Sequence, residues 1–178
     1  MTKQLTKTYL LAIAVIASLF SVSGAVAQEA KKASVVVEAP WARASHAGVK
    51  TAGGYVHLVN NGDKDDFLVA VKSPIAAKIQ LHKMALVNNI MKFKLLQHPI
   101  LVKAHSDFTL KPGAFHIMFM DLKKPLVKGE TFPAVFFFKH SAPVNATFVV
   151  GGMDDVSAPV SAKEPVAVIT TTTKTVSK

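Results

Sequence analysis

The chain has 178 residues, a formal charge of +10 at pH 7, 50% hydrophobic residues and no cysteine. The missing cysteine excludes disulfides and thiolate metal ligands, and it also removes the residue to which a bacterial lipoprotein attaches its lipid. We therefore expect a domain that is stabilised by a hydrophobic core, for which the chain is long enough. The lysines are scattered, without a basic helix or a platform of stacking aromatics, so nucleic acid is not an expected partner. The charge fits either a solvated basic surface or attraction toward an acidic protein or an anionic membrane surface.

The first 27 residues have the pattern of a signal peptide. Lys3 and Lys7 precede the apolar run from Tyr9 to Phe20, and the small residues Ala25-Val26-Ala27 follow. This order of basic, apolar and small residues is typical of a leader that is cleaved during export. The run is too short to span a bilayer, and the alternative is an interfacial helix. We expect residues 1–27 to be removed, a flexible N-terminus over 28–33, and a periplasmic protein that does not span the membrane.

The remaining chain reads as many short strands separated by turn signals. In chain order, the expected strands are Ser34–Val37, Tyr55–Val59, Asp66–Val71, Lys78–Met84, Ile90–Leu96, Phe108–Leu110, Phe115–Leu122, Phe132–Lys139 and Ala146–Val150. A kinked segment, Ala39–Arg43, carries the single tryptophan, and no segment has a helical period. This pattern predicts an all-β, cupredoxin-like β-sandwich in a single domain over residues 34–155. Residues 156–178 are expected to form a flexible C-terminal tail.

Two tripeptides share the pattern His-x-Met. They are His82-Lys83-Met84 and His116-Ile117-Met118, and each lies in an expected strand. Residues i and i+2 of a strand point to the same face, so each tripeptide presents an imidazole beside a thioether. Such soft donors favour copper(I), and a thioether does not need to lose a proton before it binds. Met91 and Met120 lie near these pairs; the alternative is that the methionines only fill a core.

Several segments, in order, resemble the periplasmic copper chaperone family called PCu(A)C. These segments are Trp41–Arg43, Gly54–Val56, Asn60–Asp63, Ser73–Ala77 with Leu81–Met84, Leu110–Gly113 with His116–Met118, and Pro125-Leu126 with Lys128–Glu130. The similarity covers roughly Ala39 to Val150. It implies a cupredoxin-like fold that binds one copper(I) ion through two histidines and two methionines. It further implies delivery of copper to the Cu(A) subunit of cytochrome c oxidase.

The resemblance assigns ligands position by position. It places the first histidine at His82 and the His-x-Met pair at His116 and Met118. The remaining methionine is expected at position 93, which is Phe93 in this chain. Met91 or Met84 is then the candidate fourth ligand, with Met120 a weaker one. A three-ligand site is the other possibility.

Two rival functions remain. The first is a sandwich module that has lost copper and binds another envelope protein. The second is a copper enzyme or electron carrier, which the sequence disfavours because it lacks the cysteine of a blue-copper site and an N-terminal histidine after residue 27. No nucleophile–base motif is present in the sequence, so we expect no catalysis.

Overall fold

The computed structural model describes residues 33–88 and 90–162, which belong to one compact unit. The predicted signal peptide and most of the predicted N-terminal and C-terminal extensions lie outside these residues. The strands are β1 (Val35–Arg43), β2 (Thr51–Asn60), β3 (Asp66–Lys72), β4 (Ala76–Val87), β5 (Ile90–Leu95), β6 (Ile100–Val102), β7 (Ser106–Leu110), β8 (Phe115–Leu122), β9 (Thr131–Phe138) and β10 (Val144–Gly151). Within the described ranges, no helix has the length and hydropathy that a membrane crossing requires.

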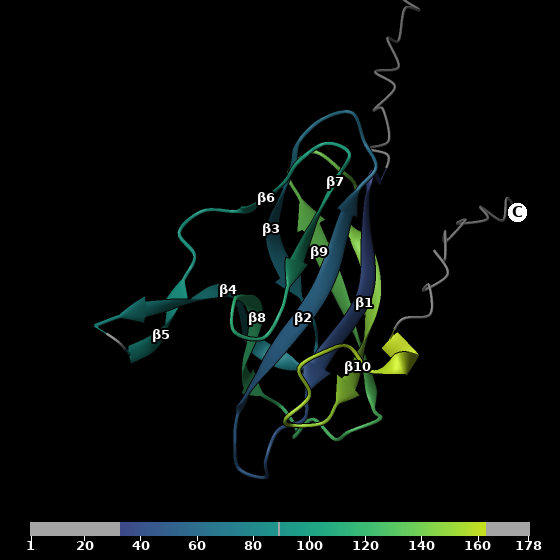
Figure 1. Cartoon of the computed structure of the whole chain (residues 1–178). Coiled ribbons are helices and arrows are strands. Elements are labelled where there is room, and N and C mark those ends of the chain that lie inside the picture. Colours follow the sequence, from purple (N-terminus) through teal and green to yellow (C-terminus); the bar gives the residue numbers. More distant parts are fainter. Residues whose placement is uncertain (1–32, 89, 163–178) are drawn as a thin grey trace, which may run out of the picture. The chain divides into compact units, whose positions relative to one another are not determined.

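Hydrogen bonds join the strands into one strongly curved, open sheet that folds over a common core (Figure 1). Its order is β5-β4-β8-β2-β1-β10-β9-β3-β6, and β7 pairs with the second half of β2. All pairs are antiparallel except β1 with β10. The predicted all-β, cupredoxin-like architecture is therefore confirmed. Strands far apart in the sequence become neighbours, and the pairing of β4 with β8 is the one that matters most for the site.

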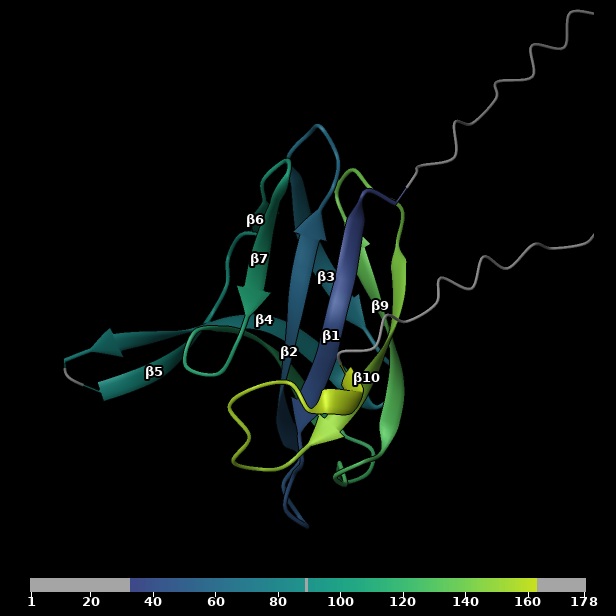
Figure 2. The same ribbon diagram turned by 45° about the vertical axis from the view of Figure 1, so that its right-hand side comes forward.

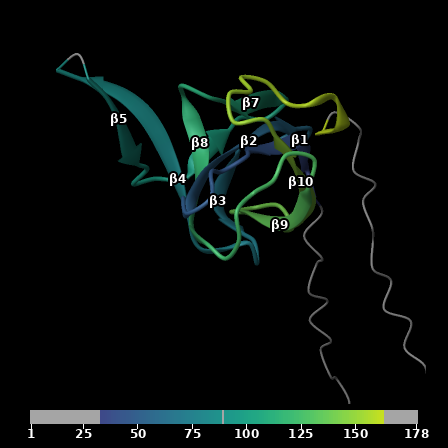
Figure 3. The same cartoon turned by 90° about the horizontal axis from the view of Figure 1, so that it is seen from below.

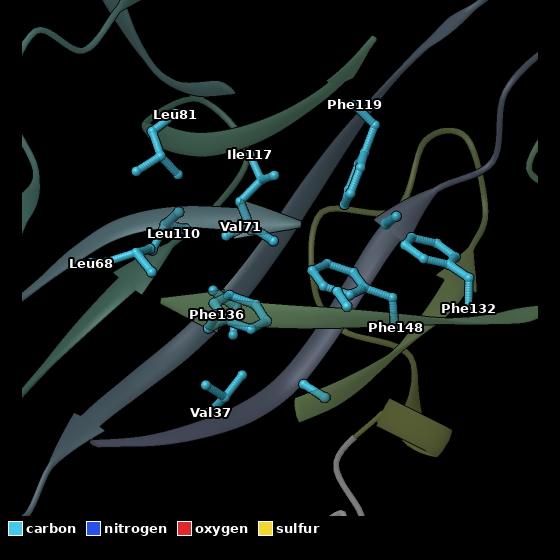
Figure 4. Close-up of a cluster of buried hydrophobic side chains, with 14 of the residues drawn as sticks. Val37, Leu68, Val71, Leu81, Leu110, Ile117, Phe119, Phe132, Phe136 and Phe148 are labelled. Carbon is cyan, nitrogen blue, oxygen red and sulfur yellow. The ribbon is translucent and has the colours of Figure 1, made fainter. Parts of the chain in front are cut away.

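Aromatic side chains from β8, β9 and β10 fill the centre of the core (Figure 4). Phe119 meets Phe148 edge to face with ring centroids 5.4 Å apart, and Phe136 stacks parallel to Phe148 at 6.0 Å. Such pairs add about 0.5–1.5 kcal/mol each beyond the apolar area that they bury. Gly54 makes this packing possible, because a Cβ at this position would lie 2.5 Å from the Phe119 ring.

The β4–β5 hairpin extends away from the body of the sandwich (Figures 1 and 2). Seen from below, it leaves the sheet beyond β8, on the side opposite β1 and β10 (Figure 3). Strand β4 is longer than the sequence predicts, because its outer half pairs only with β5, whereas its inner half pairs with β8. In the inner half, Ile79 and Leu81 pack against the core from the face that the sequence predicted for them, whereas Lys78 and Lys83 are exposed.

Several details differ from the sequence expectations; β2, for example, begins at Thr51 instead of Tyr55. Strand β6 was not expected, because three residues are too few to show a period. The predicted kink lies inside β1, where Ala39 has a φ of 45° and the register with β2 shifts between Glu38 and Trp41. Within the segment expected to form a tail, a short 3-10 helix at Val160–Ala162 places the buried Ala162 against Trp41 and Tyr55.

A buried carboxylate ties the start of β3 to the loop after β9. Asp66 accepts hydrogen bonds from the backbone N–H groups of Phe67, His140 and Ser141. Burial alone would raise the pKa of Asp66, but the hydrogen bonds from Ser141 and from these backbone groups outweigh it and lower the pKa. The charged form of Asp66 therefore stabilises the fold.

We expect Asp66→Asn to destabilise the protein by about 1.5–3 kcal/mol at neutral pH, because an amide nitrogen cannot accept the bond from Ser141. Urea unfolding measures this difference. The folded pKa of Asp66 lies below the ordinary value of 3.8, so its stabilisation is present above that pH and is lost as the pH falls through and below it. The exposed-residue variant Asp154→Asn is the control. Equal unfolding midpoints for the two variants would contradict the assignment.

Candidate metal centre

The two histidines singled out from the sequence lie directly opposite each other on neighbouring strands. His82 of β4 pairs with His116 of β8, and their ring centroids are 5.8 Å apart. Directly opposed residues of an antiparallel pair point to the same face of the sheet. Their neighbours Leu81 and Ile117 point into the core instead and fix this orientation. The structure thus brings both predicted nitrogen ligands together.

Methionines flank the histidine pair along the same face. Met118 lies opposite Gln80, one step along the face from His116, and its side chain is half-buried. Met84 lies one step from His82 in the opposite direction, and it is also half-buried. Met120 lies farther along the row, opposite Lys78. Two thioethers therefore lie next to the histidine pair, one on each side.

Each imidazole uses one nitrogen for a hydrogen bond and leaves the other without a partner. Nδ1 of His116 donates to the Ala114 carbonyl at 3.1 Å, and Nε2 of His82 lies 3.2 Å from Oε1 of Gln80. Both partners are acceptors, so these nitrogens carry the protons. The remaining nitrogens, Nδ1 of His82 and Nε2 of His116, are buried and have no hydrogen-bond partner. Each therefore holds a free lone pair, as a metal ligand requires.

A tight turn before β8 supplies the carbonyl that orients His116. Pro112 and Gly113 occupy its central positions, Gly113 has a φ of 80°, and the Ala114 N–H donates to the Lys111 carbonyl. This is the geometry of a type II turn, for which Pro followed by Gly is the favoured pair. The Ala114 carbonyl accepts from both His116 and the backbone N–H of Met84. This one turn therefore forms hydrogen bonds with both His116 of β8 and the backbone of Met84 in β4.

Position 93, where the resemblance expects a methionine, is indeed beside the site. Phe93 pairs opposite Met84, and its ring meets the ring of His116 edge to face with centroids 5.4 Å apart. The phenyl group covers part of His116, although 61% of Phe93 itself is exposed. Met91 lies one step farther out, with its backbone opposite Leu86; its side chain is outside the described part of the structure.

The environment keeps His82 neutral. Burial lowers the pKa of His82 below its ordinary value of 6.5, and the electrostatic influence of the neighbouring His116 and Lys78 lowers it further. A neutral imidazole is the form that binds a metal. His82 is therefore held in its ligating form at neutral pH.

Sequence reasoning missed the residues that orient the imidazoles. Gln80 could have been found, because it lies two residues before His82 and so shares its strand face. The Ala114 carbonyl could not, because a backbone group leaves no signal in the residue type. The role of Phe93 as a cover over His116 also depends on strand pairing that only the structure shows.

The family model described as "Putative lipoprotein LpqE-like" matches residues 35–150, well over half of the chain. The chain belongs to this family, which is the PCu(A)C family. Over 108 residues, which are 61% of the chain, the sequence is 32% identical to that of "Putative lipoprotein Lxx21020" of Leifsonia xyli subsp. xyli (strain CTCB07). The match spans 64% of that relative's length.

Solved PCu(A)C domains share the fold. The apo PCuAC domain from PmoF1 is 29% identical with a TM-score of 0.58, over 68% of this chain and 96% of that one. The copper-bound PCuAC domain from PmoF2 is 25% identical with a TM-score of 0.57, over 68% and 95%. The copper(I) solution structure of DR1885 from Deinococcus radiodurans is 24% identical with a TM-score of 0.51, over 72% and 83%, and shows likeness of fold alone. The expected family is confirmed.

The donor set restricts what the site can bind. Nowhere in the described ranges do three or more His, Asp or Glu side chains gather in a group that could hold a metal. A metal at the histidine pair would complete its coordination with thioether sulfur from the flanking methionines. Imidazole together with thioether suits copper(I) and leaves hard cations such as magnesium or calcium without their preferred oxygen ligands.

The lowered pKa of His82 predicts acid sensitivity of the apo protein. The folded pKa lies below 6.5, so the unfolded chain takes up this proton first, and stability falls as the pH drops through 6.5. We expect the urea midpoint to fall more steeply over this range in the parent protein than in His82→Gln. An NMR titration of the ring should place its midpoint below 6.5. Parallel pH profiles in the two proteins would contradict the prediction.

Proposed function

We propose that this protein is a copper(I) metallochaperone without catalytic activity, in which copper is the cargo. The observation that carries the proposal is the pair of buried, unpartnered lone-pair nitrogens on opposed histidines, flanked by thioethers. A buried polar atom without a hydrogen bond is costly, and a bound metal ion would satisfy both nitrogens at once. The known copper-bound PCuAC domain from PmoF2 agrees with this reading.

His82, His116 and Met118 would supply three ligands, and the strand register favours Met84 as the fourth. Met84 is the next residue after His82 on the same face. Met91 lies opposite Leu86, which is four residues or about 13 Å along β4 from His82. Met84 is therefore closer to the pair, and Met91 becomes a ligand only if its side chain reaches back along the hairpin.

The position of the row on the outer face of the sheet suits transfer. Met84 and Met118 are half-buried, so an acceptor protein can displace them first while the buried ring nitrogens of the two histidines retain the ion. All four donors are neutral, so release of copper leaves no buried charge behind. We propose that the acceptor is the Cu(A) subunit of cytochrome c oxidase and that transfer takes place in the periplasm. The signal-peptide pattern of residues 1–27 supports export.

An anaerobic copper(I) competition titration tests the site. The protein should bind one ion, and His116→Ala should weaken binding by at least about a hundredfold, because even residues that only orient ligands contribute about 10–100-fold. Met84→Leu should weaken binding more than Met91→Leu. His46→Ala and Met153→Leu change exposed residues away from the row and serve as controls. A parent protein that binds no copper(I) would overturn the proposal.

Phe93→Met should restore the methionine that the family resemblance expects. The position lies opposite Met84 and beside His116, so a thioether there would add a sulfur ligand to the row. We expect copper(I) affinity to rise about tenfold, equivalent to about 1.4 kcal/mol. Phe93→Leu removes the ring without adding sulfur and is the matched control. Equal affinities for the two variants would place position 93 outside the coordination sphere.

The same phenyl ring favours a second candidate function. If Phe93 prevents copper from reaching His116, the domain acts as a copperless module that binds another envelope protein. The close ring contact at 5.4 Å supports this alternative. It predicts that Phe93→Met or Phe93→Leu binds copper(I) while the parent does not, so the titrations above distinguish the two functions.

A further inference from the structure

A large groove lies beside the metal centre, between the β4–β5 hairpin and the β6–β7 segment. Its volume is about 1010 Å³, at the upper end of the range for small-molecule pockets. Phe93 and Leu95 of β5 form one side, and Leu101, Phe108 and Phe115 contribute to the rest of the lining. The groove is therefore apolar and has room for several side chains of a partner.

Much of this apolar lining is open to solvent. Phe93, Leu95 and Leu101 are 61%, 45% and 37% exposed, which is unusual for large hydrophobic residues lying together. Exposed apolar surface of this kind marks a place where another molecule binds. Phe93 and Leu95 are also the β5 residues paired opposite Met84 and His82. A molecule in the groove would therefore lie next to the copper ligands.

The charges around the groove indicate the chemistry of that molecule. Lys83, Lys94 and Lys103 line it, against a single carboxylate, that of Asp107. A second copy of this chain is a poor fit, because each copy has a large excess of Lys and Arg over Asp and Glu and would bring its own lysines to the contact. A flat bilayer surface does not fill a concave groove. A partner with protruding apolar side chains and nearby carboxylates satisfies both the lining and the lysines.

We propose that this groove is the docking site for the acidic protein that exchanges copper with the histidine pair. The proposal rests on the copper-transfer function and adds where the partner binds. Apolar side chains of the partner contact Phe93, Leu95 and Leu101, and its carboxylates face the lysines. Docking against Phe93 places the partner beside His116, whose ring Phe93 covers. The basic residues also accelerate the encounter with an acidic partner at low salt.

To test the proposal, short peptides that bind the apo protein are selected from a random library. NMR then maps the surface of the protein to which the enriched peptides bind. We expect sequences that combine Leu, Ile or Phe with Asp or Glu, and shifts of backbone amides in β5, β6 and β7. Lys94→Glu with Lys103→Glu should weaken binding about tenfold and remove its salt dependence. Lys123→Glu with Lys128→Glu makes the same charge change near the far end of β8 and should leave binding unchanged.

Three outcomes would overturn the proposal: no enriched peptide, enrichment of basic peptides, or shifts that lie elsewhere on the domain. Vesicles of phosphatidylglycerol and phosphatidylcholine provide the membrane arm. If the protein cosediments with these vesicles and the binding depends on Lys94 and Lys103, the groove binds lipid, and this result would also overturn the proposal. Copper(I) affinity should be the same in both double variants. Because the peptide experiment uses apo protein, a failure of copper binding in the parent is a separate result.

Discussion

The register between β4 and β8 is the constraint on which the metal centre depends. It sets His82 opposite His116, while the adjacent opposed pair of Leu81 and Ile117 points into the core. A slip of either strand by one residue would turn its imidazole inward and expose its core residue, Leu81 or Ile117, so burial of the core also enforces the alignment of the histidines. The aromatic cluster of Phe119, Phe136 and Phe148 thus serves the site indirectly, because it stabilises the layer to which β8 belongs.

Desolvation and hydrogen bonding then give the histidines their chemistry. The carbonyl of Ala114 and the amide of Gln80 fix the protonated nitrogen on each ring, and burial leaves the other nitrogen with a free lone pair. Burial also disfavours protonation of His82, so the ring is ready to bind a metal at neutral pH. In the proposed copper-bound state, the ion would satisfy both of these unpartnered nitrogens.

The projecting hairpin joins the metal centre to the neighbouring groove. Strand β5 contributes Phe93 and Leu95 to the groove and, through its pairing with β4, places the same residues opposite Met84 and His82. Phe93 therefore belongs to both surfaces, since it lines the groove and contacts the ring of His116. In a metallochaperone this continuity is useful, because the acceptor must come within bonding distance of the ion before the histidines release it.

Alternation of side chains along the strands was enough for the sequence to predict the all-β class, most strands, and the placement of His82 with Met84 and of His116 with Met118 on shared faces. It could not show that β4 and β8 are neighbours, since 27 residues lie between Val87 and Phe115 in the chain. Nor could it show that Phe93 contacts His116, that Gln80 and Ala114 orient the rings, or that a groove opens beside β5. A period of two residues fixes which face a side chain occupies, but strand order and register are decided by long-range packing of the core.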